Sequence, residues 1–423
     1  MMRSILATIL AVVAAPVLSA QNPEPKPPGT LPPSITGKPY EPVTPTAATT
    51  PKPAPIERFK GQGVSSEALV AVDACKEAAG WLSRLSKADG RFVPGIDPTL
   101  SRELSGSDVH QAMACLGLAR LAKFTGDEKL AALASQCCLT LLTLAKPDAK
   151  DTTQRVPTIA ADRGSKVAFA ALLATSNCEL PNPDAALLLD AEKLARFLYG
   201  RLRKDGSVQC GEAADGKDAI EDVGLVFQCL MATDRGTPAA WKSDALARAV
   251  AFYSEAFKTE KSSEFCAALL PGLCEYALKA KSEAATKFAL ELADELCERQ
   301  YSATDAKKLG WVGAFKPATG DEPTIRTACG LQGLAAATLV AAQVPDAARF
   351  KKYRSTCSAA MGFLRTLQFG DGNAKHFERS FRQNYLLGGV FGSPSDGCPR
   401  ADHAGLFAAG LLQYLETGIE KGD

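Results

Sequence analysis

Carboxylate and imidazole side chains stand at the starts of three apolar segments rich in small residues. Asp108 and His110 lie in SGSDVHQAMACLGLA, Asp222 lies in KDAIEDVGLVFQCL, and Asp402 and His403 lie in RADHAGLFAAGLL. Carboxylates and imidazoles that converge on a concave site can serve as general acids and bases. Hydrolysis of a glycoside, for example, uses two carboxylates on opposite sides of the bond that breaks. These five residues are therefore the candidate catalytic residues.

The same residues also have a purely structural interpretation. Asp108 and Asp402 are well placed to cap a helix, because a side-chain oxygen there accepts hydrogen bonds from free backbone N–H groups. His110 and His403 stand just inside the predicted helix starts and can be ordinary residues at the edge of a core. Both interpretations stay open from the sequence alone.

A second group of residues is suited to binding a ligand. Arg326 precedes the apolar segment TACGLQGLAAATLVAA, although it can also pair with an acidic residue four positions earlier. Trp311 and Phe315 fall in the loop KKLGWVGAFKPATGDEP, and His376 falls in the longest predicted loop, 369–401. Loops held on a rigid scaffold often carry recognition residues. We therefore predict that these four residues contact a ligand.

Helices must position these residues, because the chain has many Ala- and Leu-rich segments with helical periodicity and few strictly alternating β-branched runs. Some segments are charged on one face, as in PDAARFKKYRSTCSAAMGFLRTLQ, and suit an outer position. Others are small and apolar nearly all round, as in HAGLFAAGLLQYL, and suit a buried position. Twelve helices are predicted, near 66–86, 107–123, 127–144, 164–177, 184–204, 219–233, 238–257, 262–279, 281–301, 323–342, 346–368 and 402–418.

The two kinds of helix alternate, with a period near 60 residues. We therefore expect an all-α fold in which about six helical hairpins close into an α/α toroid of inner and outer helices; an open solenoid is the alternative. If the inner helices run parallel, their N-termini share one end of the ring. The candidate catalytic residues and Arg326 then gather around that rim, and loop 369–401 can cover it.

A short phrase recurs between these segments. It reads GWLSRLSKADG at 80–90, RFLYGRLRKDG at 196–206 and GFLRTLQFGDG at 362–372, and an eroded copy occupies 296–315. We predict that its aromatic-Leu pair packs inward from the last turns of an outer helix. We also predict that Asp-Gly ends that helix, because Gly tolerates a left-handed backbone.

This repeat, followed by a small apolar helix, resembles that of the superfamily of squalene cyclases and protein prenyltransferase β subunits, the prenyltransferase and squalene oxidase repeat. The resemblance covers most of 66–418 and implies an α/α toroid around a central cavity. It does not extend to the catalytic motifs. The Asp-x-Asp-Asp that protonates squalene and the Asp-Asp-x-x-Asp that binds magnesium and diphosphate have no counterpart in this chain.

The segment LGGVFGSPSDGCPRADHAGLFAAGLLQYLE, at 387–416, is similar to the last zinc-ligand segment of prenyltransferase β subunits. By that resemblance His403 takes the position of the zinc-binding His and Cys329 that of the Cys, whereas Thr327 replaces the Asp. Zinc needs three or four ligands. The set is incomplete, so no cofactor is expected, and zinc at Cys329 and His403 is the one metal option that the resemblance offers.

The 423-residue chain divides into three parts by composition. Residues 1–20 have the apolar run and small final residues of a signal peptide, and 21–59 are rich in Pro and Thr, as in an extended linker. The α/α-toroid domain is then expected at 60–423, in a protein exported to the periplasm or outside the cell; an uncleaved membrane anchor is the alternative. The 13 Cys residues permit disulfides there but do not specify their pairing.

The net charge is +1, from 48 basic and 47 acidic residues, which argues against a nucleic-acid partner. Because the catalytic sets of the superfamily are incomplete, the first functional hypothesis is an exported binding scaffold for a carbohydrate, a small molecule or a protein. Its binding surface would be the rim with loops 302–322 and 369–401. The alternative is a carbohydrate-active hydrolase or lyase that uses the rim carboxylates and His.

Overall fold

The computed structural model describes residues 54–60, 64–211 and 219–418, all within the unit Lys52–Asp423. The predicted signal peptide and nearly all of the predicted linker lie outside the described residues. The folded part begins earlier than predicted, because Pro55–Phe59 (η1) form a 3-10 helix that buries Ile56 and Phe59. The ring of Phe59 lies 5.9 Å from that of Phe124, so the end of the predicted linker packs on the core.

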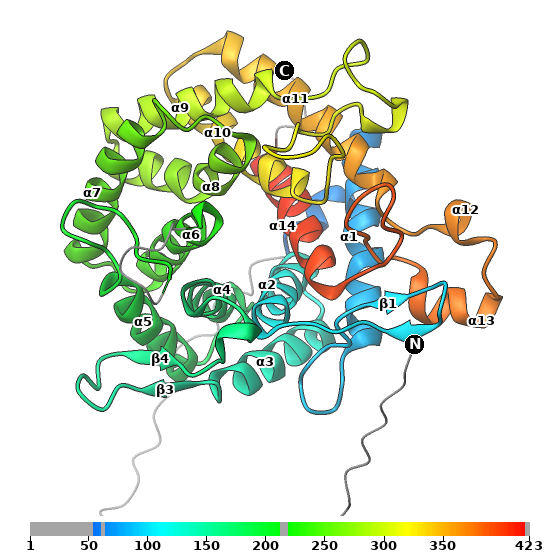
Figure 1. The fold of residues 1–423 in the computed structure, drawn as a ribbon, viewed down its shortest axis with the longest axis horizontal. Coiled ribbons are helices and arrows are strands. Elements are labelled where there is room, and N and C mark those ends of the chain that lie inside the picture. The colour runs from blue at the N-terminus through cyan, green and yellow to red at the C-terminus, as the bar shows by residue number, and fades with distance from the viewer. Residues whose placement is uncertain (1–53, 61–63, 212–218, 419–423) are drawn as a thin grey trace, which may run out of the picture. The chain divides into compact units, whose positions relative to one another are not determined.

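Two concentric sets of helices build this unit (Figure 1). The inner helices are α2 (Asp108–Thr125), α4 (Lys166–Glu179), α6 (Ile220–Gly236), α8 (Ser263–Ala280), α10 (Thr327–Gln343) and α14 (Ala401–Thr417). The outer helices are α1 (Ser66–Leu85), α3 (Glu128–Leu142), α5 (Ala185–Tyr199), α7 (Ala240–Ala256), α9 (Glu283–Glu298) and α11 (Ala347–Thr366). Each inner helix packs against the next, and α14 packs against α2, so the inner ring is closed. The predicted α/α toroid is confirmed, and the open solenoid is excluded.

The difference between inner and outer helices follows from their sequences. Thirteen of the 17 residues of α10 are buried, whereas seven of the 20 residues of α11 are. An outer helix therefore keeps one face in water, and an inner helix is enclosed by neighbours on nearly every side. Several helices also begin at a Ser that caps the first turn, as Ser107 does for α2, Ser165 for α4 and Ser262 for α8.

Glycine lets neighbouring inner helices approach closely. A Cβ added to Gly117 of α2 would lie 2.3 Å from the Cα of Gly405 in α14, closer than any real side chain could lie. In α6, a Cβ on Gly224 would lie 2.1 Å from the carbonyl oxygen of Ala268 in α8. The small residues that mark the inner helices in the sequence thus set the distance between them.

The recurring Asp-Gly phrase does not end a helix as predicted. The outer helices α1 and α5 stop at Leu85 and Tyr199, and Asp-Gly follows in a tight turn. The turn at Gly90 (φ +80°) is closed by a β-bridge between Ser86 and Phe92, and the matching turn at Gly206 (φ +97°) is closed by one between Leu202 and Val208. Equivalent bridges join Gln300 to Phe315 and Gln368 to Val390. The repeat is therefore a turn between an outer helix and the inner helix that follows it, in four of the six hairpins that the structure describes, and it becomes a longer loop in the last two copies.

Short elements occupy the connecting loops. The antiparallel pairs are β1 (Ile96–Asp97) with β2 (Arg102–Glu103), and β3 (Ala145–Pro147) with β4 (Arg155–Pro157). In loop 369–401 the chain forms α12 (Asp371–Ala374) and α13 (Arg379–Phe381), so the third Asp-Gly begins a helix. In the part of the chain that the structure describes, no helix combines the length and the apolarity needed to cross a bilayer.

Candidate active site

A cavity of about 360 Å³ opens at the end of the ring where the inner helices begin. Its rim carries polar residues from the first turns of five inner helices or the residues just before them: His110, Glu221, Glu264, Arg326, Asp402 and His403. The predicted convergence of inner-helix N-termini is therefore present. It brings together three of the five candidate catalytic residues and one of the four predicted ligand-binding residues.

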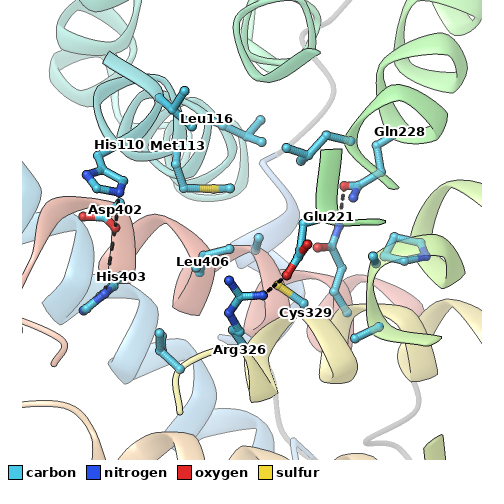
Figure 2. A pocket seen from close by; sticks show the side chains of 18 of the residues that line it. His110, Met113, Leu116, Glu221, Gln228, Arg326, Cys329, Asp402, His403 and Leu406 are labelled. Carbon is cyan, nitrogen blue, oxygen red and sulfur yellow. Dashed lines mark hydrogen bonds and ion pairs between the residues drawn. The ribbon is translucent and has the colours of Figure 1, made fainter. Parts of the chain in front are cut away.

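Asp402 lies between two imidazole rings (Figure 2). Its Oδ2 atom is 3.9 Å from Nε2 of His110, which comes from α2, and 3.8 Å from Nε2 of His403, its neighbour on α14. Its Oδ1 atom is 3.4 Å from Nε of Arg400. The two imidazole distances are too long for direct hydrogen bonds but suit a bridging water or ligand hydroxyl. Asp402 is 7% exposed, so this carboxylate faces the cavity with little access to bulk water.

The hydrogen bonds of His110 define the orientation of its ring. The backbone N–H of Ser107 donates to Nδ1 at 3.3 Å, while the Ser107 hydroxyl accepts from the His110 N–H, in a reciprocal cap. Nη2 of Arg400 lies 3.4 Å from the same Nδ1. Because Nδ1 accepts a hydrogen bond, the neutral ring carries its proton on Nε2, which is the atom that faces Asp402.

His403 is the more enclosed of the two rings. Its side chain is 16% exposed, against 43% for His110. Burial lowers the pKa of His403 below its ordinary value, although the negative charge of Asp402 opposes this change. Within the described residues, Nδ1 of His403 is buried and has no hydrogen-bond partner. A neutral His403 beside an acidic group is equipped to take up a proton during a reaction.

The facing wall of the cavity carries a different set of charges. Arg326 forms an ion pair with Glu221, and Figure 2 shows this pair across the cavity from Asp402. Glu264 accepts a hydrogen bond of 2.8 Å from the backbone N–H of Ala318. Met113 and Leu406 lie between the two polar groups in the same view. The rim thus has an acid–base cluster on one side and an ion pair on the other.

Asp108 and Asp222 are not among the residues that line the cavity, contrary to expectation. Asp108 forms ion pairs with Arg91, at 3.1 Å, and with Arg163, at 3.3 Å. It does not cap α2, because Ser107 is the capping residue. Asp222 accepts a hydrogen bond of 2.5 Å from the Ser165 hydroxyl. These carboxylates tie neighbouring segments together. Asp402 is likewise not a helix cap, since α14 begins after Arg400 without a side-chain cap.

The aromatic residues expected to face a ligand lie in the core. Trp311 is 5% exposed and packs on Tyr301 with ring centres 5.6 Å apart. Phe315 is 6% exposed and its ring fills the space beside Gly330. The eroded copy of the repeat folds inward at its β-bridge, which buries both rings. His376 is exposed in loop 369–401 and is not among the cavity-lining residues.

The two residues named for zinc line the same cavity but do not form a metal centre with a third ligand. Among the described residues, no group of three or more His, Cys, Asp or Glu side chains is arranged to hold a metal ion. Burial raises the pKa of the Cys329 thiol to about 11, so it is protonated at neutral pH. The Thr327 hydroxyl, at the position of the missing Asp, instead accepts a hydrogen bond of 3.4 Å from the Phe315 N–H.

Sequence reasoning missed the deeper walls of the cavity. One turn below the rim they are apolar, and one turn further Arg120, Gln228 and Gln332 line both this cavity and a second one, with Gln332 donating to Gln228 at 3.2 Å. We call these three residues the waist. Beyond the waist a second cavity, of about 300 Å³, is lined by charged residues that include Lys123 and Glu179. Helical spacing from the rim residues was the signal available: position 228 is seven after 221, and 332 is six after 326.

Comparison with known proteins places the fold. No family model matches the chain, and no curated protein matches it. An unsaturated glucuronyl hydrolase specific for heparin is similar in structure, with a TM-score of 0.58 and 14% identity over 82% of this chain and 97% of the other. The unsaturated glucuronyl hydrolase of Bacillus sp. GL1 has a TM-score of 0.56 and 16% identity, over 83% of this chain and 98% of the other. Cellobiose 2-epimerase of Bacillus thermoamylovorans has a TM-score of 0.58 and 10% identity, over 83% of this chain and 98% of the other.

These comparisons correct the resemblance drawn from the repeat. The similar structures are glucuronyl hydrolases and epimerases, not squalene cyclases or prenyltransferases, so the assignment to the terpenoid cyclase and squalene oxidase repeat superfamily is wrong. The physical reason is that aromatic-Leu and Asp-Gly serve the packing and turn of a helical hairpin, which any α/α toroid needs. The first functional hypothesis, a binding scaffold with prenyltransferase-type repeats, rested on that assignment and is therefore wrong as well. The described chain is an α/α toroid of the kind found in these carbohydrate-active enzymes.

Proposed function

We propose that this protein is a carbohydrate-active hydrolase whose sugar substrate binds at the rim of the cavity. The observation that carries the proposal is the position of one carboxylate, Asp402, between the Nε2 atoms of His110 and His403. The carbohydrate chemistry of the structurally similar enzymes supports it as an analogy of fold. Export to the periplasm or the outside of the cell, which the N-terminal residues predict, remains part of the proposal.

Asp402 and the two imidazoles have complementary tasks in this proposal. A sugar hydroxyl or a water molecule on the cavity side of the cluster can hydrogen-bond to Asp402 and to an imidazole at once, because atoms 3.8 or 3.9 Å apart can both lie within hydrogen-bonding range of a third atom beside them. Asp402 or neutral His403 then accepts a proton from the attacking water, whose oxygen bonds to the anomeric carbon as the bond from that carbon to the leaving oxygen breaks. Glu264 on the facing wall, in its protonated form, gives its proton to the leaving oxygen, which departs as an alcohol. The Nε2–H of His110 is directed toward Asp402 and can donate a hydrogen bond to the sugar or the water there. The apolar wall below limits the access of other water molecules.

The ion pair on the facing wall is suited to substrate recognition. Arg326 is 58% exposed in its side chain although it is paired with Glu221, so it can exchange or share this partner with a ligand oxygen. Glu221 and Glu264 place carboxylates across the cavity from Asp402, where a second carboxylate of a glycosidase would stand. We propose that Arg326 and Glu221 hold the sugar while the cluster on α2 and α14 acts on it.

A second reaction is favoured by the presence of two imidazoles at one carboxylate. Removal of a proton from a carbon next to a carbonyl, and its return to the other side, requires two groups that exchange protons with the same atom. His110 and His403 come from different helices, and each faces Asp402. This arrangement would serve epimerisation of a reducing sugar as well as hydrolysis.

One assay separates the two reactions. The purified full chain is incubated with a panel of disaccharides that includes unsaturated uronyl disaccharides and cellobiose, in D₂O, and the products are followed by NMR. A hydrolase yields monosaccharides, and an epimerase yields a stereoisomer with deuterium at the exchanged carbon. Turnover by the wild type that is lost in Asp402→Asn supports the proposal. Absence of any product across the panel, or full activity of Asp402→Asn, contradicts it.

A further inference from the structure

The middle of the upper cavity is a continuous apolar band. Met113, Leu116, Leu225, Ala267, Cys329 and Leu406 line it, and these residues come from the same five inner helices that carry the polar rim. Met113 and Leu406 are visible between the two polar groups in Figure 2. No Phe, Tyr or Trp side chain is among the lining residues in the described part of the chain.

Helical spacing fixes the depth of this band. On α14, Asp402 and His403 stand at the rim and Leu406 follows one turn later; on α6, Leu225 follows Glu221 and Gln228 follows Leu225. Each turn advances about 5.4 Å along the axis. The band therefore lies about one turn below the acid–base cluster, and the polar waist of Arg120, Gln228 and Gln332 follows about one turn further down.

A second sugar ring fits this band poorly. Its hydroxyl groups would leave water and meet aliphatic side chains, and each buried hydroxyl without a partner is unfavourable. The nearest polar groups below the rim belong to the waist, where Gln332 already donates to Gln228 at 3.2 Å. An alkyl or aryl group, by contrast, loses nothing by leaving water and gains burial. A cavity of about 360 Å³ has room for such a group beneath one sugar.

We propose that the substrate is an amphipathic glycoside, with its sugar at the rim beside Asp402 and an uncharged alkyl or aryl group in the apolar band. This inference rests on the proposed function for the reaction, but it names the substrate class from the wall of the cavity alone. The polar rim selects the head, the band selects the apolar part, and the waist limits its length to about two helical turns.

Calorimetric titration of the full chain with methyl, butyl and octyl β-D-glucopyranoside, below the micelle concentration, tests the band. Each buried methylene should strengthen binding about fourfold, and we expect octyl glucoside to bind at least about 100-fold more tightly than methyl glucoside. Leu225→Asn and Met113→Gln should each reduce this ratio at least about tenfold. The matched control Leu139→Gln, at a residue of α3 that is 57% exposed, should leave it unchanged.

The outcomes separate this inference from the proposed function. Equal affinity for the three glucosides, or a chain-length effect that survives both band variants, overturns the amphipathic substrate even if disaccharides are turned over. A chain-length effect that the band variants abolish, and that Asp402→Asn retains, supports it even if no hydrolysis is found. Octan-1-ol that binds as tightly as octyl glucoside would show that the rim does not recognise the sugar, and would also overturn the inference.

Discussion

Nε2 of His403 lies 3.8 Å from Oδ2 of Asp402, and the two residues are neighbours in the first turn of α14. Their side chains leave the helix about 100° apart, yet both line the cavity because α14 begins at its rim. His110 reaches the same carboxylate oxygen from α2. One carboxylate thus lies beside two imidazoles. Removal of this carboxylate should therefore reduce any reaction at this site more than removal of either imidazole.

Substitution Asp402→Asn should lower kcat at least about 100-fold on the best substrate of the disaccharide panel, because general acid–base groups typically contribute that much or more. The amide keeps the shape of the side chain, so the melting temperature should change by only a few degrees. Asp73→Asn is the control, since Asp73 is 68% exposed on α1 and far outside the lining set. A decrease of less than about threefold in Asp402→Asn would remove this carboxylate from the reaction.

His403 should make the protein less stable in mild acid. Burial lowers the pKa of its folded state, with Asp402 opposing and Arg400 adding to the effect. An unfolded His titrates near pH 6.5, so unfolding takes up a proton between the two pKa values. The stability contributed by neutral His403 is full above about pH 6.5 and is lost as the pH falls through the folded pKa.

His403→Gln should therefore flatten the dependence of the melting temperature on pH below about 6.5. Differential scanning fluorimetry at steps of half a pH unit measures it. His376→Gln, at an exposed His of loop 369–401, should follow the wild-type curve. Identical pH profiles for wild type and His403→Gln would mean that burial does not affect this imidazole as described.

Glu179, at the second cavity, should stabilise the fold above pH 4.5. Burial raises the pKa of Glu179, but Arg120, Arg235 and Lys123 more than offset this and lower it to about 2. The stability contributed is present above the unfolded pKa near 4.3 and is lost as the pH falls toward 2. We expect Glu179→Gln to cost about 1–2 kcal/mol at pH 7, since Lys123 and Arg235 are nearly half exposed and remain partly solvated. Urea unfolding at pH 7 and at pH 3 measures this cost. An equal cost at the two pH values would contradict the lowered pKa of Glu179.

Gly117→Ala should destabilise the ring where α2 meets α14. The added methyl group would meet Gly405 at 2.3 Å, and backbone shifts of this kind cost about 1–3 kcal/mol. Gly362→Ala on α11 is the matched control, because no atom lies within 4 Å of the added group. That variant should gain about 0.5–1 kcal/mol from helix propensity. Opposite signs in chemical denaturation support the close contact, and two gains would contradict it.

The ring could be predicted because its pattern is local. Segments such as TACGLQGLAAATLVAA are apolar on every face, and only an enclosed helix satisfies them. The convergence of Asp402, His403 and His110 followed from the same alternation, since inner helices that run parallel must start at one end. Arg326 was predicted on the same ground, and it lines the cavity.

What failed depended on side-chain direction and on loop geometry. Asp108 and His110 are two positions apart, which turns their side chains about 200° from each other on α2, so one faces the cavity and the other faces Arg91 and Arg163. Glu221, not Asp222, points into the cavity for the same reason. The aromatic residues of the 302–322 loop were misplaced because the β-bridge from Gln300 to Phe315 folds that loop inward. The copy of the repeat at 296–315 lacks Asp-Gly, so the sequence did not show where its bridge would form.

The contact of Gly117 with Gly405 has a consequence for synthesis of the protein. It joins α2 to α14, which lie far apart in the sequence, so a nascent chain holds His110 long before Asp402 and His403 exist. The three residues can come together only after α14 has been synthesised. The proposed enzyme therefore stays inert while it is being made and, if it is exported unfolded, until it has crossed the membrane.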